Sequence, residues 1–485
     1  GIKPLYYWAN QQSLVFGSEL KAILHFSEIP KEIDFVALDQ FLTIEYIPAP
    51  RTIFKDIYKL PAGHQLIFEQ SGLTIKKYWD IPYRETSTDF EYCTEQLSEL
   101  IRDAVQIRMI SDVPLGAFLS GGIDSSAIVA FMSNASPNPI KTFSIGFADA
   151  TYNELPHARA VAHHIGTAHF DQILNPDIAA MASRLVGHFD EPFGDFSIFP
   201  TFLVSELARQ QVKVVLSGDG GDEVFAGYET YVAQQYAQFY GYLPAQMRQR
   251  LLPALMNQVK PRPAKKGIIN KAKRFTEGAA LPPTLQHTRW MMFLNGCDKE
   301  QLYSPHLRAE VDDLSVAAYF EEIFSQAPSP DPLAQQQYVD IKTYLAENIL
   351  TKVDRMSMAA SLEARVPLLD HRIVEFAVNL PAEFKLHRGR TKILLREAMR
   401  TCLPDLVLEK PKQGFSIPLK HWLRESLKPL MQDLLSQSCL RQRGYFNPQT
   451  VTRWMEEHEQ GRYNHSHRLW ALMVFELWHR TIFSE

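Results

Sequence analysis

The stretch Leu119-Ser120-Gly121-Gly122-Ile123-Asp124-Ser125-Ser126 decides how the chain is interpreted. An apolar run from Val113 to Leu119 leads into it and predicts a short buried strand. After it, apolar residues recur at helical spacing from Ile128 to Met132, and the segment 134–139 ends that helix. The Ser/Gly cluster is therefore predicted to form a turn between a strand and a helix.

A turn of this composition suits a phosphate ligand. Its glycines let the backbone approach a ligand closely, and free N–H groups at the start of a helix favour an anion. Two hydroxyls and the carboxylate of Asp124 at the same turn suit phosphate oxygens and a bound magnesium ion. The turn is neither a Walker A loop, since no Gly-Lys-Ser/Thr follows, nor a dinucleotide fingerprint. The structural alternative is a helix capped by serines and an aspartate.

Two further strands with similar turns are predicted downstream. The segment Ile140 to Phe147 forms one, followed by a helix around Ala158 to Ile165. The other, Val212 to Leu216, runs directly into Ser217-Gly218-Asp219-Gly220-Gly221-Asp222-Glu223. Strands that alternate with helices predict an α/β fold with a doubly wound parallel sheet. Because ligands of such sheets bind beyond the carboxyl ends of the strands, we expect the three turns to converge on one active site.

Bulk composition limits the classes of partner. A chain of 485 residues is expected to form two or three domains, and its net charge of −5 argues against a nucleic-acid partner. Its four cysteines contain no Cys-x-x-Cys pair, which suits a reducing compartment and supplies no zinc knuckle. The apolar run Leu469 to Trp478 is interrupted by Glu476 and is too short to span a bilayer. We therefore expect a cytoplasmic protein with small-molecule substrates and no membrane partner.

The chain before the predicted sheet is built differently. Residues 1–8 and Ser13 to Phe16 predict two strands, and the segment 63–75 predicts a hairpin with its turn at residues 70–72. The polar, irregular segment Asp80 to Asp89 is the predicted boundary, after which helices and strands alternate.

Motifs in both parts of the chain resemble the class B asparagine synthetases. On its own, Ser120 to Ser126 resembles the pyrophosphatase loop of enzymes that split ATP into AMP and pyrophosphate. Gly1 to Tyr7 and Ser18 to Ala22 resemble the closing part of the family's glutaminase domain. The resemblance is specific to this glutamine-dependent family because further motifs follow in order: Ser217 to Tyr228, Asp354-Arg355, Glu363 to Asp370 and Lys412-Gln413-Gly414-Phe415.

This resemblance implies a domain organisation. Residues 1–82 would be the C-terminal remnant of a glutaminase domain with the N-terminal-nucleophile fold, lacking the family's first-residue cysteine. Residues 83–485 would be a synthetase domain of the ATP-pyrophosphatase (adenine nucleotide α-hydrolase-like) type with a helical C-terminal part. The chain as given is then expected to use free ammonia rather than glutamine. A homodimer is a further possibility, since members of the family often dimerise.

The resemblance also implies a reaction that uses ATP and Mg²⁺. A carboxylate attacks the α-phosphorus of ATP and releases pyrophosphate, and ammonia then displaces AMP. Because charge builds on the leaving pyrophosphate, the site needs N–H groups, hydroxyls and a cation. Asp124 and Asp222 match the family's magnesium-binding aspartates, and Ile145 and Gly218 match backbone contacts to the adenine. The positions that match the nucleotide site are Phe118, Ser120, Gly121, Gly122, Asp124, Ser125, Ser126, Ile145, Ser217 and Gly218.

Lys412 and Asp219 are the catalytic candidates. Lys412 matches a lysine that stabilises negative charge, whereas without the family match a solvated loop is the expectation. Arg388 and Lys392 lie at a basic helix start, where contact with pyrophosphate and a surface role are equally expected. Asp219 stands where asparagine-forming enzymes have Glu, so its carboxylate reaches about 1.5 Å less far. A general base must lie within hydrogen-bond reach of its proton, so this difference bears on the substrate.

Three functions remain open. The first is asparagine synthesis from aspartate. The second is the same adenylation and amidation of another carboxylate, such as a sugar acid of a surface polysaccharide or a β-lactam-synthetase-like substrate. Asp219 points to it. A second departure from the family pattern is Asn153, near a position where an Asp is often found, and Glu154 would take the place of that Asp. The third is a nucleotide-binding scaffold without catalysis, against which Asp124, Asp222 and Lys412 argue.

Overall fold

The computed structural model describes residues 1–147, 149, 153–240, 242–244, 246–248, 268–279, 281–311, 315–410, 412, 414 and 417–483. Gln413 and Phe415 of the last sequence motif lie outside this part of the chain.

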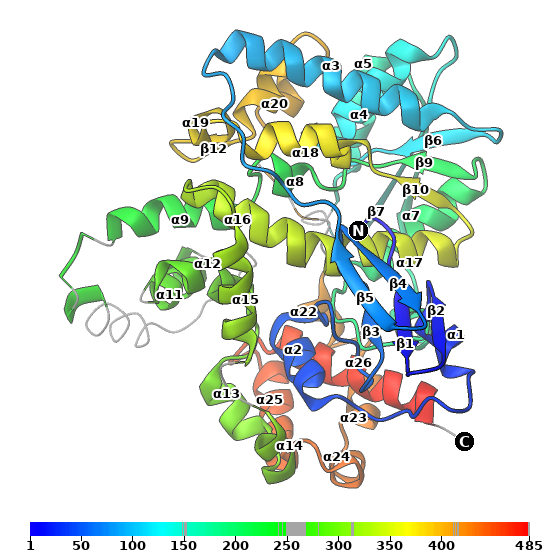
Figure 1. The fold of residues 1–485 in the computed structure, drawn as a ribbon, viewed down its shortest axis with the longest axis vertical. Helices are drawn as coiled ribbons and strands as arrows, with labels where there is room; N and C mark the ends of the chain where they lie inside the picture. Colours follow the sequence, from blue (N-terminus) through cyan, green and yellow to red (C-terminus); the bar gives the residue numbers. More distant parts are fainter. Residues whose placement is uncertain are drawn as a thin grey trace.

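The chain after the predicted boundary contains a five-stranded parallel sheet, in the order β10-β9-β6-β7-β8 (Figure 1). Its strands are β6 (Leu115–Phe118), β7 (Lys141–Phe147), β8 (Ala168–Leu174), β9 (Val214–Leu216) and β10 (Glu363–Arg365). The predicted parallel sheet is thereby confirmed, and the three strands predicted from the sequence, β6, β7 and β9, are neighbours in it. Their carboxyl ends therefore lie side by side.

Helices cover both faces of this sheet. On one side α3 (Phe90–Met109) packs on α4 (Ile123–Ala135), which contacts β6, and α5 (Leu155–Ile165) contacts β7 and β8. On the other side α7 (Ile198–Arg209) packs on β7 and on α17 (Thr351–Ala359) (Figure 1). Side chains alternate between the two faces, as the pleat requires. In β9, for example, Val215 joins one hydrophobic core and Leu216 joins the other.

The helix α3 shows how local sequence sets an element. Asp89 caps it by accepting a hydrogen bond from the Tyr92 backbone N–H at 3.1 Å, which satisfies one of the free donors of the first turn. Its buried residues recur every three or four positions and face the sheet layer: Cys93, Leu97, Ile101, Ala104 and Val105. The α/β part also contains α6 (Ile178–Val186) and α8 (Gly221–Val224).

A continuous helical segment runs from residue 332 to residue 359, and its last part packs on α7 and β10. It begins with α16 (Pro332–Asp340), continues as the π-helix η3 (Ile341–Leu350) and ends with α17. Before it lie α9 (Glu229–Tyr240), α11 (Ile268–Ala279), α12 (Pro283–Met291), α13 (Gly296–Leu302), α14 (Pro305–Glu310) and α15 (Ser315–Gln326).

After β10 the chain is mainly helical. The elements that follow are η4 (Pro367–Leu369), α18 (His371–Val378), α19 (Ala382–Lys385), β11 (Leu386–His387), β12 (Arg390–Thr391), α20 (Ile393–Ala398), α21 (Asp405–Leu408), α22 (Leu419–Trp422), α23 (Lys428–Leu434), α24 (Gln437–Arg443), α25 (Pro448–Glu459) and α26 (Ser466–Phe483). Among the described residues no helix is both long and apolar enough to cross a membrane.

The first 77 residues form two small antiparallel sheets and two helices. Their elements are β1 (Tyr6–Ala9), β2 (Leu14–Gly17), α1 (Leu20–Leu24), α2 (Phe35–Ile44), β3 (Tyr58–Lys59), β4 (His64–Glu69) and β5 (Gly72–Lys77). The predicted hairpin is confirmed as the antiparallel pair β4–β5. No helix or strand occupies residues 78–89, the segment of the predicted boundary.

The core of this N-terminal part is shared with the end of the chain. Helix α2 packs against α26, and Phe54 lies beside the Trp478 ring with centroids 5.7 Å apart. His467 Nδ1 lies 2.8 Å from Glu45 Oε1, and the indole N–H of Trp478 donates to the Asp190 carbonyl at 2.7 Å. The N-terminal part therefore does not pack around a core of its own.

Candidate active site

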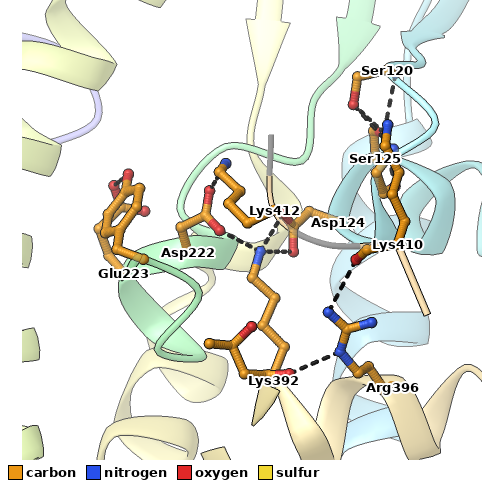
Figure 2. Close-up of polar contacts among 12 residues, drawn as sticks. Ser120, Asp124, Ser125, Asp222, Glu223, Lys392, Arg396, Lys410 and Lys412 are labelled. Carbon is orange, nitrogen blue, oxygen red and sulfur yellow. Dashed lines mark hydrogen bonds and ion pairs between the residues drawn. The ribbon is translucent and has the colours of Figure 1, made fainter. Parts of the chain in front are cut away.

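The turn between β6 and α4 is a compact hydroxyl-lined loop. Gly121 has φ +70°, and a Cβ there would lie 2.6 Å from the Ala158 backbone nitrogen, so only glycine fits. The Ser120 N–H donates to Ser125 Oγ at 3.2 Å, and that hydroxyl donates to the Gly122 carbonyl at 3.2 Å. These bonds close the loop over the first turn of the helix, with Ser120 Oγ 3.1 Å from Ser125 Oγ (Figure 2).

A second turn, between β9 and α8, lies against the first. Gly218 packs so closely that an added Cβ would lie 2.6 Å from the Ser125 backbone nitrogen. Gly221 is equally tight, since its Cβ would lie 2.5 Å from Asp124 Oδ1. The glycines of this motif therefore let the two turns approach each other. As a result Asp124 and Asp222, 98 positions apart by their residue numbers, face one another.

Two lysines neutralise the two facing carboxylates. Lys392 Nζ lies 2.5 Å from Asp124 Oδ2 and 2.6 Å from Asp222 Oδ1, and its side chain is only 3% exposed. Lys412 Nζ forms an ion pair with Asp222 Oδ2 (Figure 2). It also lies 5.7 Å from the centre of the Tyr228 ring. Lys392 adopts a left-handed backbone conformation, φ +56°, just before α20. The site therefore holds two buried negative and two positive charges.

The charges of this cluster shift its pKa values in opposite directions. Burial, helped by the neighbouring charge of Asp222, raises the pKa of Asp124 in spite of Lys392. Burial acts on Asp222 in the same sense, but Lys392 and Lys412 outweigh it and lower the pKa of Asp222. Burial opposes the charge on Lys412, yet Asp222 and Asp124 raise the pKa of its ammonium group. Lys412 is therefore a permanent cation near neutral pH.

Glu223 and Tyr228 form a buried pair next to the cluster. The Tyr228 hydroxyl donates to Glu223 Oε1. Burial, with the charge of Asp222, raises the pKa of Glu223 to about 8, so this carboxyl is largely protonated at pH 7. The Gln337 side-chain amide donates to the Glu223 and Val224 carbonyls at 2.8 and 2.7 Å. Sequence reasoning did not single out this pair, although both residues lie within the motif Ser217 to Tyr228.

Asp219 lies on the wall of the site but not within the charge cluster. Its Oδ2 accepts a hydrogen bond from Ser217 Oγ at 2.5 Å, and the residue is half-buried. The shorter side chain is thus held against its own turn. Its predicted role as a base stays a prediction.

One cavity of about 380 Å³ joins these groups. The carboxyl ends of β6, β7 and β9 contribute Phe118, Ile145 and Ser217. One further ion pair lies in its wall, with Lys352 Nζ 2.9 Å from Asp195 Oδ2. Glu154 also lines the cavity, and its Oε1 lies 3.1 Å from Nζ of Lys410. Of the predicted site residues, those that line the cavity are Phe118, Ser120, Asp124, Ser125, Ile145, Ser217, Gly218, Asp219, Asp222 and Lys412.

The other predicted residues lie behind the cavity wall. Gly121 and Gly122 shape the loop, whereas Ser126 is fully buried in α4 and its hydroxyl has no hydrogen-bond partner in the structure. Of the two basic residues left open, Lys392 lies in the site and Arg388 is exposed. Sequence reasoning missed Asp195, Lys352 and Lys410, because each is defined by a partner more than 150 positions away.

The donor set suits a magnesium ion. Asp124 and Asp222 supply hard carboxylate oxygens from two elements, and Asp222 Oδ1 makes no hydrogen bond, since its contact with Lys392 lacks hydrogen-bond geometry. Among the described residues no group of three or more His, Cys, Asp or Glu is arranged to hold a metal on its own. Any such ion would therefore complete its coordination with oxygens of the ligand, as Mg²⁺ commonly does with phosphates.

A hydroxyl-lined turn and paired carboxylates at the carboxyl ends of a parallel sheet define a nucleotide-binding α/β protein of the ATP-pyrophosphatase type. Comparison with known proteins is more specific. Residues 96–480 match the family model described as asparagine synthase, and residues 1–79 match that of a glutamine amidotransferase domain. The chain belongs to the asparagine synthase family, whose members are ATP-dependent amidotransferases and form C–N bonds.

Relatives carry two kinds of name. The chain is 31% identical to asparagine synthetase [glutamine-hydrolyzing] 1 of Bacillus subtilis, covering 99% of this chain and 74% of the relative. It is 32% identical to a putative asparagine synthetase [glutamine-hydrolyzing] of Mycobacterium bovis, and the match covers 100% of this chain and 74% of the relative. It is also 27% identical to the amidase chyE of Penicillium rubens, and the match covers 92% of this chain and 70% of the relative.

Proposed function

We propose that the protein adenylates the side-chain carboxylate of aspartate with ATP and then forms asparagine from the acyl-adenylate and ammonia. The observation that carries this proposal is the convergence of the hydroxyl-lined loop, Asp124, Asp222 and Lys412 on one cavity. Family membership and the names of two relatives point to the same reaction.

Each group has a task in the adenylation step. The acceptor oxygen attacks the α-phosphorus, and the bond to the bridging oxygen breaks, which leaves negative charge on pyrophosphate. The N–H groups and hydroxyls of the Ser120–Ser125 loop bind that charge at the start of α4. Lys412, a permanent cation, stabilises it further. Asp124 and Asp222 would hold Mg²⁺, which supplies charge neutralisation to the phosphates when bound.

The pair Asp195–Lys352 supports an amino acid as the acceptor. Asp195 precedes α7, Lys352 projects from α17, and both line the cavity. Although burial opposes its ionisation, Lys352 and Ser197 lower the pKa of Asp195, which favours its charged carboxylate. An α-carboxylate on Lys352 and an α-ammonium on Asp195 would match these charges, whereas a sugar acid offers no ammonium group.

Asp219 favours the second candidate, amidation of a different carboxylate. Its carboxylate lines the cavity but accepts a hydrogen bond from Ser217 of its own turn, and it is one methylene shorter than the Glu of asparagine-forming enzymes. The relative named as an amidase shows that not every similar protein carries a synthetase name.

The deciding experiment measures pyrophosphate release from ATP-Mg²⁺ with ammonium as the nitrogen donor. The acids offered are aspartate, glutamate, succinate and a uronic acid. Release with aspartate, together with asparagine detected by mass spectrometry, supports the first candidate. Release only with another acid replaces it by the second. In the variants Asp124→Ala and Lys412→Ala we expect release to be lost while the far-UV spectrum is unchanged.

The variant Lys352→Met separates the acceptor from the nucleotide. We expect it to raise KM for aspartate at least about tenfold, because one charged contact contributes roughly 1.5–3 kcal/mol, and to leave KM for ATP unchanged. An equal rise in both constants would remove the acceptor role of this pair. Arg184→Gln, which disrupts an exposed pair with Glu206, is the matched control.

A further inference from the structure

The loop that carries Lys412 is held at its base by two groups outside the charge cluster. The first is Glu154, the residue before α5, whose Oε1 lies 3.1 Å from Lys410 Nζ. Both side chains are largely buried, with 7% of Lys410 and 12% of Glu154 exposed. A buried ion pair gives little net stability because of its desolvation, so its presence here calls for another role.

The second group is Arg396 on α20. Its guanidinium donates to the carbonyls of Leu408 and Lys410, and its Nε donates to the Thr391 carbonyl at 2.8 Å. These partners are backbone oxygens, so Arg396 fixes the path of the chain rather than a charge. Since Arg396 stands one turn after Lys392, the same helix start holds both the carboxylate cluster and the base of the loop (Figure 2).

These contacts end two residues before Lys412. Lys412 lies outside any helix or strand, and its side chain is 31% exposed; its ammonium contacts Asp222 and lies near the Tyr228 ring. Glu154, just before α5, holds Lys410 by its side chain, and Arg396 of α20 holds it by its carbonyl. The chain two residues before Lys412 is thus fixed from two sides, which limits where the Lys412 ammonium can lie.

We propose that Glu154, Lys410 and Arg396 are positioning residues that clamp the base of this loop and so place the Lys412 ammonium at the reacting phosphates. The proposal rests on the proposed function for the role of Lys412, but the clamp itself has a readout that needs no activity. Misplacement of a catalytic group by about 1 Å reduces the rate by roughly 100-fold. We therefore expect Glu154→Gln and Lys410→Met to lower kcat by roughly 10- to 100-fold with little change in KM for ATP.

Three comparisons test the clamp in the full chain. The double variant Glu154→Gln/Lys410→Met is expected to lose no more than either single variant, because both remove one contact. In a Lys412→Ala background, Glu154→Gln is expected to have no further effect on residual turnover. Lys410→Arg, which keeps the charge, is expected to restore most of kcat. Glu409→Gln, in the exposed pair of Glu409 with Arg390 beside this loop, is the matched control.

Hydrogen exchange supplies the readout that is independent of turnover. Glu154→Gln is expected to speed amide exchange at residues 408–410 and 412 at least about fivefold and to leave β6 and β7 unchanged. Unchanged exchange at residues 408–410 and 412 would overturn the clamp. So would a raised KM for ATP without a change in exchange, since Glu154 would then be contacting the nucleotide. Faster exchange in a protein that adenylates no acid would uphold the clamp and reject the proposed function.

Discussion

Replacing Lys392 by methionine is the sharpest test of the charge cluster. Methionine keeps a similar length and the left-handed backbone position, so the change removes mainly the ammonium group. In the protein that group lies 2.5 Å from Asp124 Oδ2 and 2.6 Å from Asp222 Oδ1, and it is almost fully buried. Its removal leaves two buried carboxylates that share the one cation of Lys412.

The expected magnitude follows from this geometry. Removing one partner of a buried ion pair costs about 3–5 kcal/mol, and we expect the lower end because Lys412 stays bound to Asp222. The pKa of Asp222 in the folded wild type lies below its ordinary value. Asp222 therefore contributes stability above pH ~3.9, which is lost as the pH falls through the folded pKa. In the variant this pKa rises and protonation relieves the repulsion, so the difference between the proteins should shrink towards pH 4.

The assay is urea unfolding followed by tryptophan fluorescence at pH 7 and pH 4.5. A lower midpoint at pH 7 and a smaller difference at pH 4.5 are expected. The control adds Asp124→Asn and Asp222→Asn to Lys392→Met, which should recover stability without recovering AMP formation. A single variant as stable as the wild type at pH 7, or a loss of equal size at both pH values, would refute the reasoning.

Three further outcomes are expected. Burial lowers the pKa of Lys385 to about 7, so between pH 7 and about 10.4 only the unfolded chain binds this proton, and the stability of the wild type should rise with pH. Lys385→Met should melt at a higher temperature at pH 7 and show no such rise; an unchanged rise with pH would contradict this prediction. Gly121→Ala should abolish ATP binding measured by calorimetry, whereas Gly166→Ala, also at positive φ but with open space around it, should keep it. Asp370 accepts charged hydrogen bonds from Arg108 and Arg372, which lower its pKa in spite of burial. Asp370→Asn should therefore lower the free energy of unfolding by about 1.5–3 kcal/mol at pH 7 and by progressively less below pH 4, measured by chemical unfolding. Equal losses of stability at pH 7 and pH 3.5 would argue against this prediction.

Within the parallel sheet, the sequence predicted the strands with a strong apolar signal and missed the edge strands that lack one. Strands β6, β7 and β9 are buried and were predicted with their turns. Strand β8 lies at the sheet edge and is half-exposed, so its residues are mixed. In β10 only Ala364 is buried, and a three-residue strand of this kind exists because β9 offers it a partner.

Some residues of the candidate site could likewise be predicted from local sequence, and others could not. Asp124 and Asp222 were paired from sequence because each follows a predicted strand, and parallel strands end at one edge. Lys392 could not be assigned, since its role depends on where α20 lies relative to α4. The partners in the pair Asp195–Lys352 are 157 positions apart, and those in the pair Glu154–Lys410 are 256 positions apart. Local sequence patterns cannot predict contacts over such separations.

The shared core of the two ends of the chain has a consequence for biosynthesis. Glu45 and His467, at the contact of α2 with α26, are 422 positions apart. At about 5–20 residues per second, a ribosome needs roughly 20–80 s to make the chain between them. During that interval the apolar side of α2, made among the first elements, has no α26 to cover it. The nascent protein therefore needs protection from aggregation until α26 emerges, and the packing of its N-terminal part is completed only then rather than domain by domain along the way.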